Sequence, residues 1–353
     1  MNQGSNEGIK MAVTLKEVAQ QAQISVPAAS LILNGKGDIY SKDTNERVQQ
    51  AARTLGYRPN LAARAARSGK FNAVGLLMSD HPAYSRLSVK LLQSVMAKLS
   101  DKEMHLTMSQ MTDAQFTDSK FLPRMLRQHM VDGMLINYTH HFPEHLSDFI
   151  HQLKLPAIWI NARLDHDSVY PDEFHAGRLA AQYLLELGHR KIHYLEFEGS
   201  VHYSRTDRRE GYTHAMMEAG LTPMHVTLPT QFPDQVDLDP MSCDTLSHVT
   251  NWLKANRDQI TAVQTHSPWE ARVLLYAAAK CGLDVPSELS VVTNGNESFN
   301  FMGIAMSSTV LPLTDMGQVA VEMLMKKIAT PQKRIRAKVL ESTMVPAQTT
   351  HAI

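Results

Sequence analysis

Apolar residues within the first sixty positions recur at every third or fourth residue in three short stretches, a spacing typical of helices that bury one face. Residues that favour a helix start come before each stretch: Thr14 three residues ahead of Glu17, Ser25 shortly ahead of Pro27, and Ser41. Residues able to adopt positive φ close the second and third stretches, namely Asn34-Gly35 and Gly56. The pattern predicts two short helices joined by a tight turn, with a third packed behind them. In this helix-turn-helix arrangement the second helix enters the major groove of DNA.

From about Phe71 onward, short apolar runs alternate with longer amphipathic stretches, which indicates parallel strands connected by helices. The expected strands are 73–78, 105–108, 133–136, 157–160, 192–195, 261–264 and 290–293. The expected helices are 87–99, 121–129, 173–187, 209–219, 269–281 and 316–328. Open parallel sheets bind ligands at the carboxyl ends of their strands, so we expect a ligand site there.

Charge is distributed unevenly along the chain, although the formal net charge of its 353 residues is +0. Residues 1–70 contain ten Lys and Arg against five Asp and Glu, a net +5, and the rest of the chain contains 25 against 30, a net −5. This asymmetry indicates an anionic partner for the N-terminal part alone. A chain of this length is also expected to form more than one core.

The cysteines and the N-terminus bear on where the protein acts. Cys243 and Cys281 make no disulfide framework, which indicates a reducing cytoplasm. The first ten residues are polar and lack the apolar core of a secretory signal, and no run reaches the length of a membrane span. We therefore expect a disordered tail at 1–12, a cytoplasmic location and no membrane partner.

Motifs of enzymes are missing from the sequence. It has no G-x-S-x-G, P-loop or G-x-G-x-x-G, so nucleophilic, nucleotide and dinucleotide chemistry lack support. A cluster of titratable residues is spaced loosely like a metal site, but it contains no H-E-x-x-H, and Pro143 predicts a loop. We interpret it as solvent-facing histidines in a protein that is not an enzyme and needs no cofactor or metal; its members are His140, His141, Glu144, His145 and His151.

The N-terminal segment resembles the DNA-binding head of the lactose-repressor/galactose-repressor (LacI/GalR) family. The matching runs are T-L-K-E-V-A at 14–19, I-S-V at 24–26, L-N-G at 33–35 and L-G-Y-R-P-N at 55–60. The resemblance extends into the rest of the chain through the runs at 131–133, 185–192, 208–212 and 284–292. It implies an all-α helix-turn-helix head followed by an α/β effector domain like that of periplasmic binding proteins, with two doubly wound subdomains joined by three crossovers.

The resemblance also implies domain boundaries. The head is expected at 13–60, a hinge at 61–70, and an effector-binding and dimerisation domain at 71–353. Within that domain the N-subdomain is expected to take 71–172 and 302–330, and the C-subdomain 173–301 and 331–353. No long heptad tail follows Thr350, so a coiled-coil tetramer is not expected.

Residues that contact DNA are carried over from the family to matching positions. Base-reading positions correspond to Val26, Pro27 and Ala28, and Leu31 stands where the family usually has a guanine-reading arginine. Without a bidentate donor there, the preference for guanine should be lost and apolar contact with thymine methyl groups favoured. Positions that touch the DNA backbone in the family correspond to Thr14, Ser25, Ser30, Asn34, Tyr57 and Asn60. Thr14 and Ser25 could instead serve only as helix caps.

The hinge departs from the family at one position. The family's minor-groove wedge is a leucine, whereas the corresponding residue here is Ala66, which is too small to open a base step. We therefore expect a weaker DNA kink, or a wedge from another residue such as Leu61. Arg64 and Arg67 are available for phosphates or a narrow minor groove, although a merely solvated basic linker is the alternative.

The effector-site positions implied by the resemblance match the family at one arginine and depart from it at several other residues. Arg208 corresponds to the family's effector-anchoring arginine, whose guanidinium suits a carboxylate or two sugar hydroxyls. Asn161, His266-Ser267 and 293–296 replace family residues that include sugar-binding carboxylates. One interpretation is a ligand unlike a neutral monosaccharide, either anionic or an oligosaccharide fragment. The other is that the binding residues have changed, and the full candidate set is Asp80, Tyr84, Asn161, Arg163, Arg208, His266, Trp269 and Asn296.

Together these observations predict a homodimeric repressor that binds double-stranded operator DNA under the control of a small-molecule effector, a sugar or a sugar derivative. The alternative is a cytoplasmic solute-binding protein without operator reading, because the body resembles those of periplasmic sugar receptors. The basic helical head favours the regulator.

Overall fold

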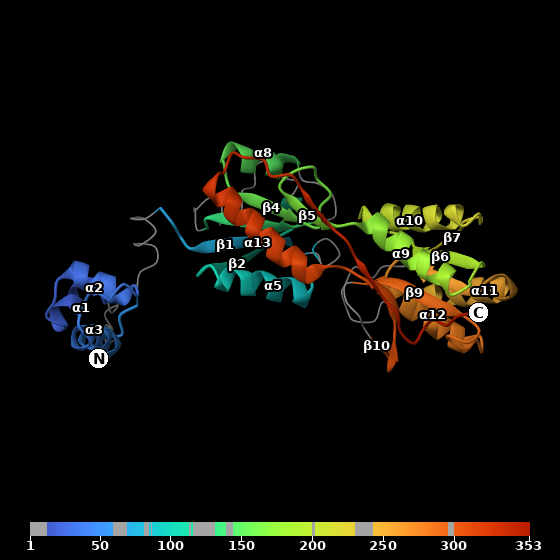
Figure 1. The fold of residues 1–353 in the computed structure, drawn as a ribbon, viewed down its shortest axis with the longest axis horizontal. Coiled ribbons are helices and arrows are strands. Elements are labelled where there is room, and N and C mark those ends of the chain that lie inside the picture. Colours follow the sequence, from blue (N-terminus) through green and yellow to red (C-terminus); the bar gives the residue numbers. More distant parts are fainter. Residues whose placement is uncertain are drawn as a thin grey trace, which may run out of the picture. The chain divides into compact units, whose positions relative to one another are not determined.

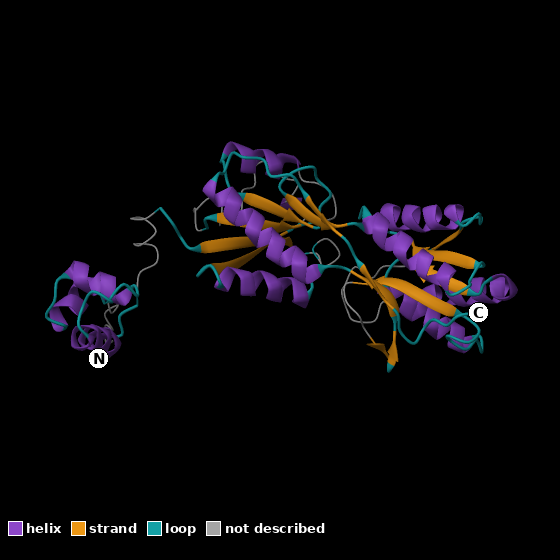
Figure 2. Cartoon of the chain, in the orientation of Figure 1, coloured by secondary structure: helices purple, strands orange, loops and turns teal. Residues whose placement is uncertain are grey.

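The computed structural model describes residues 13–58, 69–80, 85, 87–112, 114–115, 131–138, 144–199, 202–229, 243–295 and 300–353. The chain forms two compact units, Met1–Phe71 and Asn72–Ile353. The first unit contains only helices among its described residues, and the second contains two parallel-rich sheets with helices around them (Figures 1 and 2).

The first unit is built from three helices, α1 (Leu15–Gln21), α2 (Val26–Leu33) and α3 (Lys42–Leu55). A reciprocal capping box begins α1, because Thr14 Oγ1 accepts from the amide of Glu17 and the Glu17 carboxylate accepts from the amide of Thr14 at 2.6 Å. Ser25 and Ser41 cap α2 and α3 through their hydroxyls. The predicted three-helix arrangement is confirmed, and its core consists of Val18, Ala19, Ala22, Ala29, Ile32, Val48, Ala51 and Ala52.

The first sheet of the second unit has the strand order β13-β5-β4-β3-β1-β2, with every pair parallel. Neighbouring residues on β1 point to opposite faces: Leu76 packs with helices α5 and α13, and Leu77 packs beneath α8. The sheet with these helices is called the first subdomain below. Its elements are β1 (Ala73–Ser79), α5 (Val89–Ser100), β2 (His105–Met111), β3 (Gly133–Asn137), α8 (Glu144–Gln152), β4 (Ala157–Ile160), β5 (Ser168–Pro171), α13 (Leu313–Ala329) and β13 (Lys338–Leu340).

The second sheet has the order β14-β12-β9-β8-β6-β7, and only β14 pairs in an antiparallel sense. Tyr194 on β6 packs under α9 and α10, and the next residue, Leu195, packs under α11 and α12. The sheet with these four helices is the second subdomain. Its elements are α9 (Glu173–Glu186), β6 (Ile192–Phe197), α10 (Ser204–Glu218), β7 (Met224–Leu228), α11 (Cys243–Asn256), η1 (Arg257–Gln259), β8 (Ala262–Thr265), α12 (Pro268–Lys280), β9 (Ser290–Gly295), the β10–β11 hairpin (Asn300–Phe301 and Ile304–Ala305), β12 (Ser307–Val310) and β14 (Thr343–Val345).

The chain crosses between the two sheets three times, but two crossings differ from the expected boundaries. The first follows β5 and leads into α9, close to the expected residue 172. The second lies between β12 and α13 rather than at 302, because β12 pairs with β9. The third lies between β13 and β14 rather than at 331, because β13 pairs with β5. The sequence of β12 is Ser-Ser-Thr-Val and that of β13 is Lys-Val-Leu, so neither strand forms an apolar run like the one that predicted β4.

The loop predicted at Pro143 and the helix predicted at 121–129 also have to be compared with the structure. Glu144, His145 and His151 lie in α8, so the expected loop is wrong there: Pro143 comes just before the helix and does not prevent it. No cluster of three or more potential metal ligands occurs in the part of the chain that the structure describes. The expected helix at 121–129, together with His140 and His141, lies outside the described residues. None of the helices in the described ranges is both long enough and apolar enough to cross a membrane.

Candidate functional site

The exposed side of α2 is apolar at its start. Pro27 lies in the first turn, where a missing N–H costs nothing, and it is exposed. Val26 and Leu31 are 39% and 37% exposed. Ala28, by contrast, is only 8% exposed, and its amide donates to Ser25 Oγ at 3.3 Å. The face therefore offers three apolar side chains to a partner, and Ala28 contributes little to it.

The polar residues around α2 are partly committed to local bonds. Thr14 uses both of its donors on Glu17, because its amide and its hydroxyl lie 2.6 and 2.7 Å from Oε2. Asn34 Nδ2 donates to the carbonyl of Ser30 at 2.6 Å, which leaves its side-chain oxygen unused by that bond.

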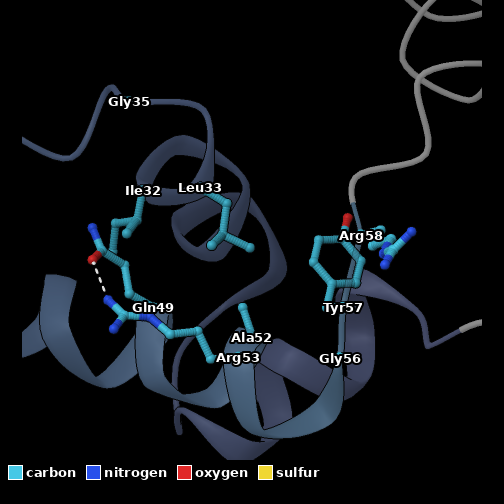
Figure 3. Close-up of a pocket in the computed structure, with 9 residues that line it drawn as sticks. All are labelled: Ile32, Leu33, Gly35, Gln49, Ala52, Arg53, Gly56, Tyr57 and Arg58. Carbon is cyan, nitrogen blue, oxygen red and sulfur yellow. Dashed lines mark hydrogen bonds between the residues drawn. The ribbon is translucent and has the colours of Figure 1, made fainter.

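A shallow pocket lies between the end of α2 and the end of α3. In Figure 3, Tyr57 and Arg58 border it where α3 has ended at Gly56, and Arg53 Nη2 donates to Gln49 Oε1 at 3.3 Å on the other side. Gly56 has a φ of 67°, which turns the chain out of α3 toward Tyr57. The remaining predicted DNA contacts, Asn60, Leu61, Arg64, Ala66 and Arg67, lie outside the described residues.

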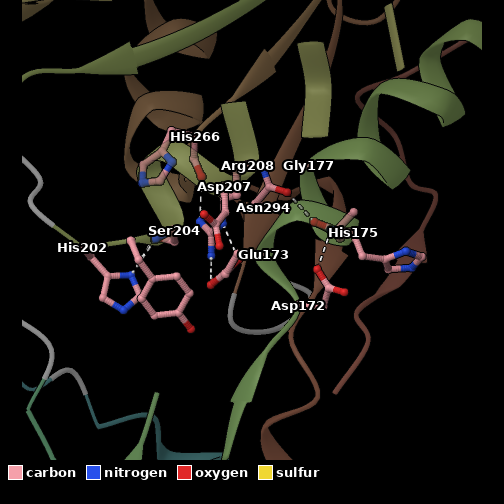
Figure 4. Close-up of polar contacts among 12 residues, drawn as sticks. Asp172, Glu173, His175, Gly177, His202, Ser204, Asp207, Arg208, His266 and Asn294 are labelled. Atoms are coloured by element: carbon pink, nitrogen blue, oxygen red, sulfur yellow. Dashed lines mark hydrogen bonds and ion pairs between the residues drawn. The ribbon is translucent and has the colours of Figure 1, made fainter. Parts of the chain in front are cut away.

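A buried ion pair lies at the centre of the second candidate site. Glu173, the first residue of α9, receives two hydrogen bonds from Arg208 of α10, from Nε at 2.6 Å and from Nη2 at 2.9 Å (Figure 4). Arg208 Nη1 donates a third bond to the carbonyl of His266 at 2.8 Å. The two residues are 7% and 2% exposed, for Arg208 and Glu173 respectively. Burial alone would lower the pKa of Arg208, but the Glu173 carboxylate outweighs it and the pKa is raised.

Two glycines bring α9 and α10 close enough for this pair to form. A Cβ atom added to Gly177 would lie 2.1 Å from the carbonyl oxygen of Arg208. A Cβ atom added to Gly211 would lie 2.1 Å from the carbonyl oxygen of Phe174. The helix backbones are therefore in direct contact on both sides of the ion pair, and any larger residue would force them apart.

His266 stands beside the pair, directly after β8. Its Nδ1 lies 3.2 Å from the hydroxyl of Tyr194. Burial, and after it the charge of Arg208, holds the pKa of His266 well below its usual value, while burial raises the pKa of Tyr194. The imidazole of His266 is therefore neutral and shares a hydrogen bond with the Tyr194 hydroxyl through Nδ1.

Side chains from the two subdomains meet next to the pair. Asn161, directly after β4, adopts a φ of 59°. Its side-chain oxygen accepts from the hydroxyl of Tyr203 at 3.2 Å, and its carbonyl lies 3.4 Å from His202 Nε2. Arg163 Nη1 lies 2.7 and 2.8 Å from the two carboxylate oxygens of Asp207. Burial lowers the pKa of His202 to about 4, so this histidine is neutral at pH 7.

Only some of the predicted effector residues gather in this place. Asn161, Arg163, Arg208 and His266 lie there together, as their contacts show. Trp269, in the first turn of α12, is half-buried and packs its ring edge-on against Phe197, with the ring centroids 4.9 Å apart. Asp80 is exposed at the end of β1, while Tyr84 and Asn296 lie outside the described residues. Sequence reasoning missed Glu173, His202, Tyr203 and Asp207, and the only available signal was that the last three lie within six residues of Arg208.

Comparison with known proteins separates the same two parts of the chain. Residues 14–60 match the family described as bacterial regulatory proteins, lacI family, and residues 181–350 match the periplasmic binding protein-like domain. The chain is 25% identical to the HTH-type transcriptional regulator RegA of Clostridium saccharobutylicum, over 96% of this chain and 100% of that protein. It is 27% identical to the HTH-type transcriptional repressor PurR of Photorhabdus laumondii, over 93% of each chain.

Solved structures show the same fold over nearly the whole length. The lac repressor dimer bound to operator and the anti-inducer ONPF matches with a TM-score of 0.76 and 20% identity, over 97% of this chain and 100% of that one. The complex of the transcriptional regulator CelR with cellobiose matches with a TM-score of 0.61 and 21% identity, over 96% and 99%. The arrangement of a helical head before two α/β subdomains is therefore shared with these regulators.

Proposed function

Because the chain belongs to the lacI family of bacterial regulatory proteins, and so is a DNA-binding regulator of transcription, we propose that it represses genes by occupying a pseudo-palindromic operator as a homodimer in the cytoplasm. Each protomer places the exposed side of α2 in the major groove of one half-site. No catalytic step is proposed.

The apolar start of α2 supports a particular kind of base reading. Val26, Pro27 and Leu31 are exposed and offer no hydrogen-bond donor from their side chains. Such residues contact the methyl group of thymine and do not pair with guanine. We therefore propose half-sites with thymine opposite Leu31, positioned by backbone contacts from Ser25, Ser30, Asn34, Tyr57 and Asn60.

The hinge part of the proposal rests on the sequence alone. Arg64 and Arg67 bind phosphates or the minor groove, and Ala66 produces a weaker kink than a leucine would. The operator is then held more by phosphates than by a wedge, so its binding falls steeply with salt.

The effector is proposed to bind between the two subdomains, next to Arg208 and His266. The observation that carries this assignment is that Asn161 and Arg163 of the first subdomain meet Tyr203 and Asp207 of the second. A ligand held by both sides changes the angle between the subdomains, and thereby the affinity of the heads for DNA. Operator binding must change effector affinity by the same factor. A sugar or a sugar derivative is the proposed ligand class.

The homodimer is supported by apolar surface in both subdomains. Val89 and Met96 on α5 are 67% and 52% exposed, and Met302 in the β10–β11 turn is 83% exposed. Exposed apolar residues of this size are suited to burial against a second copy of the chain.

Operator selection from random duplexes with the full-length protein tests the proposal, when repeated with a panel of neutral sugars and sugar acids. A palindromic site whose recovery changes with one compound supports both the regulator and the effector assignment. Failure to recover any specific site, with or without compounds, would leave the solute-binding protein as the better description.

A further inference from the structure

We propose that Glu173 is an internal counter-ion that occupies Arg208 in place of a ligand anion, and so restricts the effector to uncharged groups at this point of the site. The inference rests on the proposed effector site but assigns a role to a residue that the sequence did not single out. Glu173 is in this view a specificity-determining residue.

Most hydrogen-bond donors of Arg208 are already used within the protein. A guanidinium has five N–H donors. The Nε and Nη2 edge of Arg208, which forms the parallel pair that a carboxylate prefers, is taken by Glu173 at 2.6 and 2.9 Å. A third donor is taken by the carbonyl of His266. The two donors that remain can serve a hydroxyl or a carbonyl oxygen of a ligand.

The buried charge of Glu173 also disfavours a second anion at Arg208. Glu173 is 2% exposed, so its negative charge is poorly screened by water. A ligand carboxylate bound to the remaining donors of Arg208 would lie on the same guanidinium as this buried carboxylate. One positive charge would then face two negative charges, which disfavours an anion relative to a hydroxyl compound of the same shape.

The neighbouring arginines are also already engaged by carboxylates of the protein. Arg163 is paired with Asp207, and both Arg205 and Arg209 lie within 3.2 Å of Glu196, whose side chain is 1% exposed. His266 and His202 are neutral because burial lowers the pKa of each. Around Arg208, therefore, each of these arginines already contacts a carboxylate of the protein, and Arg205 and Arg209 share the same one.

Glu173 is held in place by the start of its helix. It directly follows Asp172, whose carboxylate accepts from the amide of His175 at 2.8 Å and whose amide donates to the carbonyl of Leu340 at the same distance. The contact of α9 with α10 at Gly177 fixes the helix that carries it. Figure 4 shows Glu173 and Arg208 facing each other from these two helices. The position of the ion pair is thus determined by the backbones of α9 and α10.

A sulfate titration of the full-length protein tests this assignment independently of DNA. Three proteins are compared: wild type, Glu173→Gln, and the double variant Glu173→Gln with Arg208→Gln, which removes both charges. The melting temperature of each is followed against sulfate at constant ionic strength. Sulfate raises the melting temperature of all three proteins, because it is excluded from the protein surface and because it binds to the basic head. We expect only Glu173→Gln to show an additional saturable rise, with sulfate affinity at least about tenfold above wild type, because ligand binding to the native state stabilises it.

Two results would overturn the assignment. One is a saturable response of the wild type that exceeds that of the double variant, because Arg208 would then be open to anions. The other is a Glu173→Gln response equal to that of the double variant. If Glu173→Gln alone does not fold, the comparison of wild type with the double variant still decides, and equal responses support the role of Glu173. If the sulfate result is as expected but no sugar alters operator binding, the effector function fails while Glu173 remains the counter-ion.

Discussion

Arg163 and Asp207 form the ion pair that joins the two subdomains, with Arg163 Nη1 at 2.7 and 2.8 Å from the two carboxylate oxygens. Arg163 also lies over the ring of Tyr203, 5.5 Å from its centroid, and the hydroxyl of that tyrosine reaches Asn161. These contacts lie beside Arg208, where the effector is proposed to bind. Any change in the subdomain angle must therefore alter the Arg163–Asp207 pair.

Loss of the pair should loosen the contact between the subdomains without unfolding them. The side chain of Arg163 is 56% exposed, so we expect Arg163→Gln to cost about 1 kcal/mol of stability or less. The effector concentration for half-maximal operator response should nevertheless shift. Arg178→Gln is the control, because it removes the arginine of another partly exposed pair, with Glu218, that lies within the second subdomain. Equal shifts in the two variants would show that the inter-subdomain pair has no special role.

The neutral histidines predict a pH dependence. Burial lowers the pKa of His202 from 6.5 to about 4. As the pH falls, His202 is protonated in the unfolded chain before it is protonated in the folded protein. The free energy of unfolding that depends on a neutral His202 is therefore fully present above pH 6.5 and is lost toward pH 4. His202 should account for roughly 3 kcal/mol at most over that range. Urea unfolding of wild type and of His202→Asn at several pH values measures this contribution. It is the difference between the two proteins in how steeply the free energy of unfolding changes with pH.

Other groups near His202 titrate with the opposite sign. Burial raises the pKa of Asp207, so its contribution is present at low pH and is lost as the pH rises through its folded pKa. For this reason the comparison must be between variants. His166→Asn, the same substitution at an exposed position, is the control for the loss of a histidine side chain. Identical slopes for wild type and His202→Asn would show that His202 does not carry the effect.

Prediction from the sequence succeeded where the signal was local. The caps at Thr14, Ser25 and Ser41 and the end at Gly56 depend on residues within a few positions of each other, and the structure confirms all four. The alternation of apolar runs and amphipathic stretches likewise predicted parallel strands connected by helices, whereas the two doubly wound subdomains were implied by the family resemblance.

The sequence could not reveal contacts between distant segments. Glu173 and Arg208 are 35 positions apart, and their pairing depends on the close approach of α9 and α10. The short strands β12 and β13 owe their existence to neighbours in the sheets, so the second and third crossings were misplaced. Ala28 looked as accessible as Val26 and Pro27, because only the packing of α2 shows which of them is buried.

The approach of α9 to α10 can be tested at Gly177. The methyl group of Gly177→Ala would meet the Arg208 backbone at 2.1 Å, so the helices must separate. We expect a net loss of about 1–3 kcal/mol from overpacking, although alanine is the better helix former by about 1 kcal/mol. The effector response should weaken with it, because Arg208 moves. Gly317→Ala provides the comparison: its nearest neighbours are side-chain atoms of Ser94 in the first subdomain, and it should leave effector affinity unchanged. A fully stable Gly177→Ala would contradict the close helix contact.

Substitution of Thr14 tests whether its hydroxyl caps α1 or contacts the DNA backbone. Both of its donors are already bonded to Glu17, so we expect Thr14→Ala to act only through the start of α1, at a cost of about 1 kcal/mol. Ser41→Ala removes the corresponding cap of α3 and should match it in thermal stability and in operator affinity. If operator affinity falls clearly further in Thr14→Ala, the hydroxyl must exchange Glu17 for a DNA phosphate on binding.

Substitution of Leu31 tests whether α2 contacts the bases as proposed. It is 37% exposed beside Val26 and Pro27, and an arginine there would supply the bidentate donor that pairs with guanine. Leu31→Arg should therefore move the selected half-site toward guanine at one position, a discrimination of about 1–3 kcal/mol. Gln50→Arg adds the same charge at an exposed position of α3, so it should raise affinity for all sequences alike without changing the preferred one. If selection from random duplexes returns the same site for Leu31→Arg and wild type, another surface of the head must face the bases.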